Sequence, residues 1–409
     1  QLEVDAFIAA VATSFKKDGV EEDGTEEEDF HDSASVSRNS FPHVQLLTPQ
    51  KGGEVLCVDF SPCGTFVSLS AVNQRSQLII LHAKTGSLQV VCRGHKGAIQ
   101  TVEYAPCGRQ LLTSSLDATA RLWDATTGAE CRTLRSDSGP LYDARFSPCG
   151  LRILTASFGG EAAMWDRDSG TRLFRMLGHA SVVVSGEFST DGSWVLTVSK
   201  DGSAQLWEAE TGQRLHVLTV PRKKIRSGRI APRADSVLAI TECGQLIQWD
   251  ARGNERWPTR LYRCEGYHVM SLAFSPDGEH IIASTRDYKV VVMEAFDFSE
   301  LDGLDMSETA PELEGLDMDF SEVEVLMESE TYETQRVGFS PCGRFLITAS
   351  TGVTGTVRLW EFAGRSEICA RQATPGVVGG VSSVAFLPNG SALFVATHAG
   401  AAYLWGRGP

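Results

Sequence analysis

The sequence predicts an all-β protein assembled from repeated units of four short antiparallel strands. Three observations support this prediction: tryptophans recur at a fixed spacing, glycine turns recur in step with them, and β-forming residues fill the intervals. Such a period is typical of an array in which each unit buries its apolar face against its neighbours. The length of 409 residues also exceeds what one compact core usually holds.

The repeat has a period of 42 residues. Trp123, Trp165, Trp207 and Trp249 follow one another at this spacing, and Leu81 precedes the first by the same interval. The accompanying turn glycines are Gly86, Gly128, Gly170 and Gly212. The hydroxyl residues eight positions before the tryptophans are Ser115, Ser157, Ser199 and Thr241.

Each unit contains four short runs that favour strands. In the second unit the runs IQTVEY, QLLTSS and ATARLW precede a glycine turn, and ECRTL follows it. Alternating β-forming residues between glycine-rich turns are typical of antiparallel strands.

A cysteine stands before glycine in the same frame of four units. FSPCG occurs at 60–64, 146–150 and 339–343, and APCG occurs at 105–108. Other units carry TDG, PDG or PNG there, and Asp or Asn followed by Gly favours a turn with positive φ. We therefore expect a turn between the first and second strands, and no shared metal ion or disulfide, because the turns belong to separate units. The cysteines concerned are Cys63, Cys107, Cys149 and Cys342.

The pattern resembles the WD-repeat family of β-propellers, whose GH…D…WD motif is complete in two units. The first set is His95, Ser115, Asp117 and Trp123, and the second is His179, Ser199, Asp201 and Trp207. The resemblance implies a buried network in which Asp orients His, Ser bridges and the Trp nitrogen donates. It thus implies a structural role for residues that otherwise look like a catalytic set. Gly159 replaces the Asp in the third unit.

The resemblance covers roughly residues 44–405 and implies a closed ring. The turn glycines define eight units, one of them a degraded copy near Asp235. The last unit ends at 401–405 without an outer strand, and HVQLLTP at 43–49 can supply it. Sharing one blade between the chain ends removes the exposed edges. We therefore expect an eight-bladed propeller over 43–409, with seven blades as the alternative.

The negative charge is concentrated in two segments. Residues 20–32 hold eight acids and residues 297–330 hold thirteen, and neither contains Lys or Arg. The two segments together carry 21 negative charges, whereas the net charge of the whole chain is −15. The remaining residues therefore carry a net positive charge. Acidic runs of this kind are usually solvated tails or insertions.

Residues 1–42 are predicted to form an N-terminal extension. An amphipathic helix is expected over 1–19, because Val4, Phe7, Ile8, Val11 and Phe15 follow a helical spacing. The acidic run and a Ser-rich linker at 33–40 follow it.

Several classes of function lack their sequence motifs. No P-loop, GxSxG or HExxH motif occurs, so we predict no catalytic site, no metal site and no cofactor. None of the ten cysteines forms a CxxC pair, which favours a reducing intracellular compartment. No apolar stretch approaches membrane-spanning length, and a membrane role is not expected.

Three features are candidates for binding. PRKKIRSGR at 221–229 enters the innermost strand of the fifth unit and is either a binding site for an acidic peptide, a phosphate or nucleic acid, or a solvated loop. Its basic residues are Arg222, Lys223, Lys224, Arg226 and Arg229. The second feature is the acidic insertion 297–330 in blade six, either a partner-binding segment or a tolerated surface loop. The third is WDxR, formed by Trp249, Asp250 and Arg252, which resembles the motif by which some WD-repeat proteins dock to a cullin–RING ligase adaptor.

These features predict a non-catalytic scaffold subunit of an intracellular multiprotein assembly, whose partners are other proteins or peptides. One alternative is a substrate receptor of a cullin–RING ubiquitin ligase, and another is a phosphate- or nucleic-acid-binding propeller. The sequence does not distinguish the cytoplasm from the nucleus, and the cytoskeleton and the cilium are further alternatives. The absence of aromatic residues within 221–229 speaks against sequence-specific nucleic-acid recognition.

Overall fold

The computed structural model describes most of the repeat region. The described residues are 44–46, 54–72, 76–83, 85–220, 223–233, 236–251, 259–262, 269–286, 289–295, 317–318, 324–328, 334–350, 356–364, 366–372, 381–388, 390, 392–397 and 402–406. The expected helix at 1–19, the acidic run and the linker lie outside these residues. Within the described part of the chain, no helix has the length and apolar character needed to cross a membrane.

The described strands pair into eight sheets, seven of four strands and one of five. We call each sheet a blade and number the blades along the chain. Blade one contains β2 (Glu54–Phe60), β3 (Phe66–Val72), β4 (Gln77–His82) and β5 (Leu88–Cys92). Blade two contains β6 (Ile99–Tyr104), β7 (Gln110–Ser115), β8 (Thr119–Asp124) and β9 (Glu130–Arg135). Blade three contains β10 (Leu141–Phe146), β11 (Arg152–Ser157), β12 (Glu161–Asp166) and β13 (Arg172–Leu177). Blade four contains β14 (Val183–Phe188), β15 (Trp194–Ser199), β16 (Ser203–Glu208) and β17 (Arg214–Thr219).

The second half of the chain repeats this order. Blade five contains β18 (Ile225–Ile230), β19 (Ser236–Thr241), β20 (Leu246–Asp250) and β21 (Thr259–Tyr262), with β25 (Asp317–Met318) added at its edge. Blade six contains β22 (Val269–Phe274), β23 (His280–Thr285), β24 (Lys289–Glu294) and β26 (Glu324–Glu328). Blade seven contains β27 (Thr334–Phe339), β28 (Phe345–Ser350), β29 (Thr356–Glu361) and β30 (Ser366–Gln372). Blade eight contains β31 (Val381–Phe386), β32 (Ala392–Thr397), β33 (Ala402–Gly406) and β1 (Val44–Leu46).

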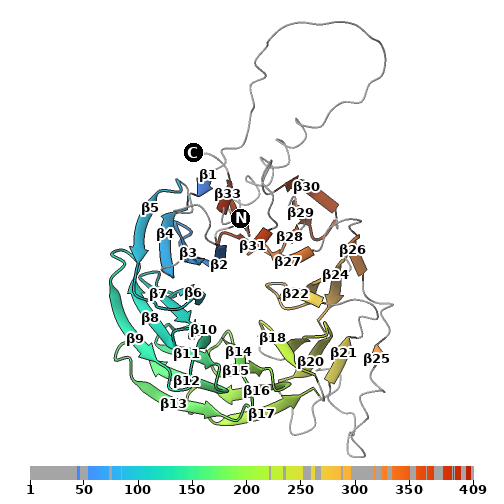
Figure 1. The fold of residues 1–409 in the computed structure, drawn as a ribbon. Helices are drawn as coiled ribbons and strands as arrows, with labels where there is room; N and C mark the ends of the chain where they lie inside the picture. The colour runs from blue at the N-terminus through green and yellow to red at the C-terminus, as the bar shows by residue number, and fades with distance from the viewer. Residues whose placement is uncertain are drawn as a thin grey trace, which may run out of the picture.

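The blades follow one another around a ring, with the first strand of each nearest the centre (Figure 1). Apolar side chains fill the space between neighbouring blades. For example, Leu112 and Leu122 of blade two and Phe146 and Trp165 of blade three belong to one buried cluster. Each blade thus buries both of its faces against its neighbours, which explains why a single unit would not fold alone.

The chain ends share blade eight. β1 pairs antiparallel with β33, with Val44 opposite Leu404 and Leu46 opposite Ala402. The predicted strand at 43–49 therefore supplies the outer strand of this blade, and the pairing covers the edge of β33.

The predicted insertion 297–330 contains part of the propeller, which corrects its boundary. β26 pairs with β24 and is the outer strand of blade six. The prediction that 297–330 is one continuous insertion is therefore wrong. The outer strand was not recognised because it is short and its acidic composition resembles that of a solvated loop. A second piece, β25, runs parallel to β21 and extends the outer edge of blade five.

The repeated cysteines lie in tight turns, as predicted. Gly64, Gly108, Gly150 and Gly343 have φ between 68° and 73°, the left-handed region that glycine adopts most readily. In the first turn, Ser61 Oγ lies 3.4 Å from Cys63 Sγ and accepts the Phe66 N–H at 2.9 Å. Hydrogen bonds to Ser61 and Thr65 lower the pKa of the exposed Cys63 thiol to about 7. The cysteine thus takes the place that Asp191 has in blade four, where its carboxylate accepts the Ser193 N–H at 3.0 Å.

We predict that β1 is required for a stable ring. Deleting residues 1–49 exposes the edge of β33 and should lower the melting temperature and promote association between chains. Deleting only residues 1–42 retains β1 and should leave both properties close to those of the full chain. Differential scanning calorimetry and light scattering measure the two effects, and equal behaviour of the two truncations would contradict the closure described above.

Candidate functional site: the inner wall and one face of the ring

The first predicted network joins His95, Asp117 and Trp123 through a threonine. The Nδ1 atom of His95 lies 2.9 Å from Asp117 Oδ2, and its Nε2 atom lies 2.7 Å from Thr113 Oγ1. The Trp123 indole N–H donates to the same Thr113 hydroxyl at 2.9 Å. Burial alone would raise the pKa of Asp117, but hydrogen bonds involving His95, Thr119 and the Lys96 amide hold it well below its usual range.

The second network repeats this arrangement in blade four. His179 Nδ1 lies 3.1 Å from Asp201 Oδ2, and Trp207 donates to Thr197 Oγ1 at 2.8 Å. Thr197 Oγ1 also lies 2.9 Å from His179 Nε2. Burial lowers the pKa of His179, in keeping with a neutral ring that donates from Nδ1 and accepts at Nε2.

The prediction that Ser115 and Ser199 bridge His and Trp is wrong in both networks. Ser115 instead donates to Gly97 O at 2.9 Å and accepts the Asp117 N–H at 3.2 Å. Ser199 makes the equivalent bonds, to Ser181 O at 3.1 Å and from the Asp201 N–H at 3.1 Å.

The register explains why the threonine bridges. Trp123 lies opposite Leu111 on the neighbouring strand, so Thr113 is its diagonal neighbour, and Ser115 lies two residues further toward the turn. A threonine ten positions before tryptophan is the sequence signal that was missed. The same bond joins Trp165 to Thr155 at 2.9 Å.

Blade three replaces the missing network with a different buried carboxylate. Gly159 stands where blades two and four have Asp117 and Asp201, and Glu161 is buried two residues later. Glu161 accepts hydrogen bonds from Ser138 and Arg175. Burial alone would raise the pKa of Glu161, but these partners lower it. In the networks of blades two, three and four, the polar groups thus bind one another within the fold and are not arranged around an open site.

A second set of polar contacts joins neighbouring blades along the inner wall, by which we mean the side chains of the innermost strands. Asp59 of blade one accepts the Tyr104 N–H of blade two at 2.6 Å, and Glu103 of blade two accepts the Phe146 N–H of blade three at 2.7 Å. Glu187 of blade four accepts the Ile230 N–H of blade five at 3.2 Å. Burial raises the pKa of Asp59 to about 6 and that of Glu103 to about 7.

The inner wall is divided by charge. Blades one to four contribute Asp59, Glu103, Asp143 and Glu187, with Arg145 among them. Arg145 Nε lies 3.1 Å from Asp143 Oδ1, and this carboxylate, followed by Glu103 and Glu187, raises the arginine pKa further. Blades five and seven contribute arginines instead.

The predicted basic cluster divides between the inner wall and the adjoining loop. Arg226 and Arg229 lie on β18, and Arg229 is 45% exposed with its Nη1 atom 3.9 Å from Glu187 Oε2. Lys223 donates to Gln245, and the side chain of Lys224 is exposed. Arg222 lies outside the described residues.

The loop before β18 belongs to one face of the ring, which we call the entrance face. It is defined by the residues that follow the second strands, Leu116, Phe158, Lys200 and Glu242. Each donates its backbone N–H to the loop before the innermost strand of its blade, as Glu242 does to Lys224 O at 2.8 Å. The entrance face therefore holds the basic loop and the turns of blades two and three together.

Aromatic and apolar side chains of two adjacent blades are exposed on this face, and we call Leu116, Tyr142 and Phe158 the patch. Phe158 is 54% exposed and Leu116 is 41% exposed, at equivalent turns of adjacent blades. Phe158 stacks on Tyr142 with ring centroids 6.4 Å apart and an interplanar angle of 23°. The sequence gives little sign of this patch, because Phe158 and Leu116 stand in turns 42 residues apart.

The WDxR residues are mostly inaccessible. Trp249 is 3% exposed and Asp250 is 9% exposed, and Trp249 packs in the cluster between blades four and five. Arg252 lies outside the described residues. Contact with an adaptor would therefore depend on Arg252.

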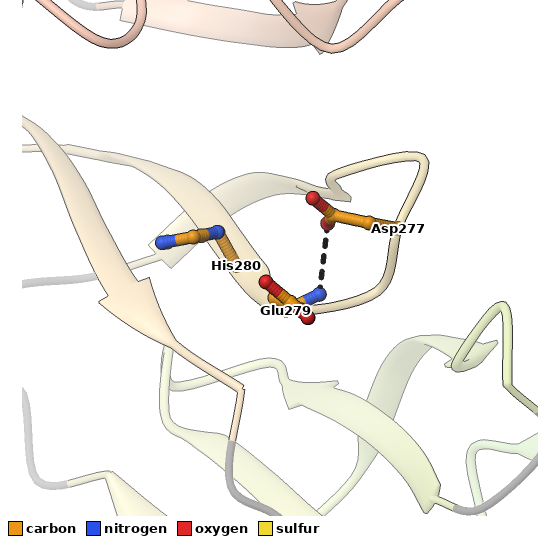
Figure 2. Close-up of side chains that lie close together, drawn as sticks. All are labelled: Asp277, Glu279 and His280. Carbon is orange, nitrogen blue, oxygen red and sulfur yellow. Dashed lines mark hydrogen bonds between the residues drawn. The ribbon is translucent and has the colours of Figure 1, made fainter.

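Among the described residues, one side-chain group has the composition of a metal site. Figure 2 shows Asp277 and Glu279 on the turn before β23 and His280 at the first residue of that strand; their ligand atoms lie within 4.8 Å of one another. Asp277 accepts the Glu279 N–H at 3.0 Å and a bond from Ser275, and Arg233 donates to Glu279 at 2.7 Å. These contacts are those of a capped turn, so we assign the group a structural role.

The ring of four-stranded blades is a β-propeller, and two of its blades contain a His–Thr–Trp network of the kind that the WD-repeat motif implies. A family model for the WD domain, G-beta repeat, matches residues 86–124, 170–208, 258–292 and 334–361. The chain therefore carries WD repeats.

Two relatives share short stretches with the chain. One is WD repeat-containing protein 86 of Homo sapiens, 44% identical over 50 residues that make up 12% of this chain and 13% of the relative. The other is the Set1 complex component swd1 of Schizosaccharomyces pombe, 36% identical over 84 residues that make up 20% of this chain and 21% of the relative. The matches thus span a minor part of each relative's length.

We predict that the Thr113 hydroxyl stabilises blade two, because it bonds both His95 and Trp123. The Thr113→Val variant keeps the shape of the side chain but leaves the Trp123 N–H and the Nε2 atom of His95 without their partner. It should lower the free energy of unfolding by about 1–3 kcal/mol. Thr133→Val on the exposed outer strand is the matched control. Denaturant titration compares the two, and equal stability of both variants would disprove the bridging role.

Proposed function

We propose that this protein is a non-catalytic scaffold subunit that binds other proteins through the entrance face. The observation that carries the proposal is the exposure of Leu116 and Phe158, with the half-buried Tyr142 stacked on Phe158. Exposed aromatic side chains are characteristic of protein interfaces, because an aromatic ring contributes large contact area at low entropic cost. WD-repeat propellers are typically protein-interaction scaffolds, which agrees with this role.

A non-catalytic role is supported by the state of the polar groups. The histidines that resemble a catalytic set are buried and bonded to threonine and aspartate, which leaves no free nucleophile–base pair in these networks. The proposal therefore assigns function to binding surfaces and not to turnover.

The two alternatives have weaker support. A ligase receptor would depend on Arg252 alone, since Trp249 and Asp250 are buried. A nucleic-acid-binding propeller would use Lys223, Lys224 and Arg226, but the inner wall beside them is acidic over blades one to four. We infer that protein partners fit the mixed surface better than an extended polyanion does.

One relative is named as a component of the Set1 complex, and membership in an assembly is proposed here by analogy with that name. We also propose that the protein acts inside the cell, because the described cysteines are free thiols and several are exposed.

We predict that the Leu116→Ser, Phe158→Ser double variant loses its principal partner. Its affinity should fall at least about tenfold, because exposed aromatic anchors often dominate binding energy. The melting temperature should change little, since both side chains are already exposed. The control is Leu173→Ser, Leu215→Ser, which alters exposed residues on the outer strands β13 and β17.

The partner would be identified by affinity purification at high salt and then reconstituted from purified components. Binding of the purified partner is measured by calorimetry with the wild-type protein and both variants. Equal loss in the control variant, or full binding by the patch variant, would contradict the proposal.

A further inference from the structure

The turn of blade three that carries Phe158 lies against the loop that enters the same blade. The Phe158 N–H donates to Pro140 O at 2.8 Å. The Gly159 N–H donates to Ser138 O, also at 2.8 Å. A Cβ atom at Gly159 would come within 2.7 Å of Ser138 O, so a side chain at this position would require the backbone to shift. Glycine in place of aspartate thus removes the His–Thr–Trp network from blade three and lets the turn contact its loop directly.

These bonds fix the backbone of the patch while its side chains remain exposed. Phe158 is held by the Pro140 carbonyl and by stacking on Tyr142. Leu116 is held in the same way in blade two, where its N–H donates to Ala98 O at 3.0 Å. A partner that covers the patch therefore orders little of this surface on binding, which favours affinity.

A lysine stands at the blade-two end of the patch. Lys96 belongs to the loop that enters blade two, and its backbone N–H donates to Asp117 Oδ2 at 2.9 Å, next to Leu116. A Cβ atom at Gly97 would come within 3.0 Å of the carbonyl carbon of Leu116, so this loop lies close against the turn. The side chain of Lys96 is exposed.

A second lysine stands at the blade-four end. Gly160, two residues after Phe158, lies against the loop that enters blade four, since a Cβ atom there would come within 2.8 Å of His179 O. Through Val182 O, the same loop accepts the Lys200 N–H at 3.0 Å. Lys200 occupies the position in blade four that Phe158 has in blade three, and its side chain is exposed.

The acids of these loops and turns are engaged within the fold. Residues 93–98, 116–118, 136–140, 158–160, 178–182 and 200–202 contain three acids, Asp117, Asp137 and Asp201. Asp117 and Asp201 belong to the His–Thr–Trp networks, and Asp137 accepts a bond from Arg172 at 2.8 Å. The surface around the patch is therefore basic.

An apolar surface between two lysines favours one kind of partner. Leu116 and Phe158 offer contact area to a large apolar side chain, and the lysines attract carboxylates on either side of it while repelling a basic segment. A single-stranded nucleic acid would need a basic path for its backbone. Tyr142, however, borders the acidic inner wall through the next residue, Asp143, which favours a short acidic segment over an extended polyanion.

We propose that the patch binds a protein segment in which a large apolar side chain is flanked by aspartate or glutamate, with Lys96 and Lys200 contacting the carboxylates. The inference rests on the proposed scaffold function, because it names the chemistry of the partner that the entrance face receives.

The test uses a fluorescein-labelled ten-residue peptide with a central Leu-Phe pair, two acidic residues on each side, and Gly and Ser at the ends. A second peptide replaces the acids by Asn and Gln, and a third replaces Leu-Phe by Ser-Ser. A labelled oligouridine serves as the nucleic-acid probe. Fluorescence anisotropy gives the affinity of the full chain for each probe at low salt and at about 1 M salt, where charges are screened within about 3 Å.

The variants separate the apolar contact from the charges. Phe158→Ser removes the aromatic anchor, with Leu173→Ser on the outer strand β13 as its control. Lys96→Glu and Lys200→Glu each reverse one charge, and Lys200→Arg retains the charge. Arg109→Glu is the matched reversal, because Arg109 is exposed in the turn between β6 and β7, at the opposite end of β7 from Leu116.

We expect the acidic peptide to bind about fivefold more tightly than the neutral peptide at low salt, as two exposed ion pairs give, and about equally at high salt. Lys96→Glu and Lys200→Glu should each weaken the acidic peptide at least about threefold, while Lys200→Arg and Arg109→Glu should bind it normally. Phe158→Ser and the Ser-Ser peptide should each lose at least about tenfold. Circular dichroism melting of each variant verifies that the ring is intact.

Equal affinity for the acidic and neutral peptides at low salt would overturn the proposal, and so would an absence of binding by the acidic peptide. Intact lysine variants that bind it as Arg109→Glu does would also contradict it. Tighter binding of oligouridine that is lost in the same variants would replace the protein segment by nucleic acid. Failure of the acidic preference leaves the scaffold proposal standing, because the purified partner is tested separately with the Leu116→Ser, Phe158→Ser variant.

Discussion

A hydrogen bond from the backbone of one blade to a carboxylate of the preceding blade is the contact on which the inner ring depends. The N–H groups on the free edge of an innermost strand have no neighbouring strand to receive them, and unpaired buried N–H groups are costly. Asp59, Glu103 and Glu187 accept three of these groups, from Tyr104, Phe146 and Ile230. Because the bonds run from blade to blade, they join blade one to two, blade two to three and blade four to five.

The same residues determine the electrostatics of the ring centre. Carboxylates that serve as acceptors on blades one, two and four leave that arc acidic, whereas Arg229 and Arg336 occupy the inner wall of blades five and seven. Structural bonds and the charge of the ring centre therefore depend on one set of positions along the innermost strands. A substitution there alters both the packing of the ring and the charge that a partner meets.

The repeat frame in the sequence predicts where strands, turns and chain closure occur, because period, β-forming runs and turn glycines are local signals. The bridging hydroxyl was misplaced because Thr113 and Ser115 point to the same face of a strand, and only the register distinguishes them. The outer strand β26 was missed because its pairing with β24 is set by tertiary contact, in a segment whose composition resembles a solvated loop. The aromatic patch combines residues from different units, which no local pattern relates.

The role of the blade-to-blade bonds is tested most directly by amide hydrogen exchange, followed residue by residue by NMR. The amides of Tyr104 and Phe146 should exchange at least about tenfold more slowly than that of Phe188, whose preceding blade offers Arg145 in place of an acid. In a Glu103→Ala variant the Phe146 amide should approach the rate of Phe188 while Tyr104 remains protected. Unchanged protection of Phe146 in that variant would show that the carboxylates do not hold the inner ring together.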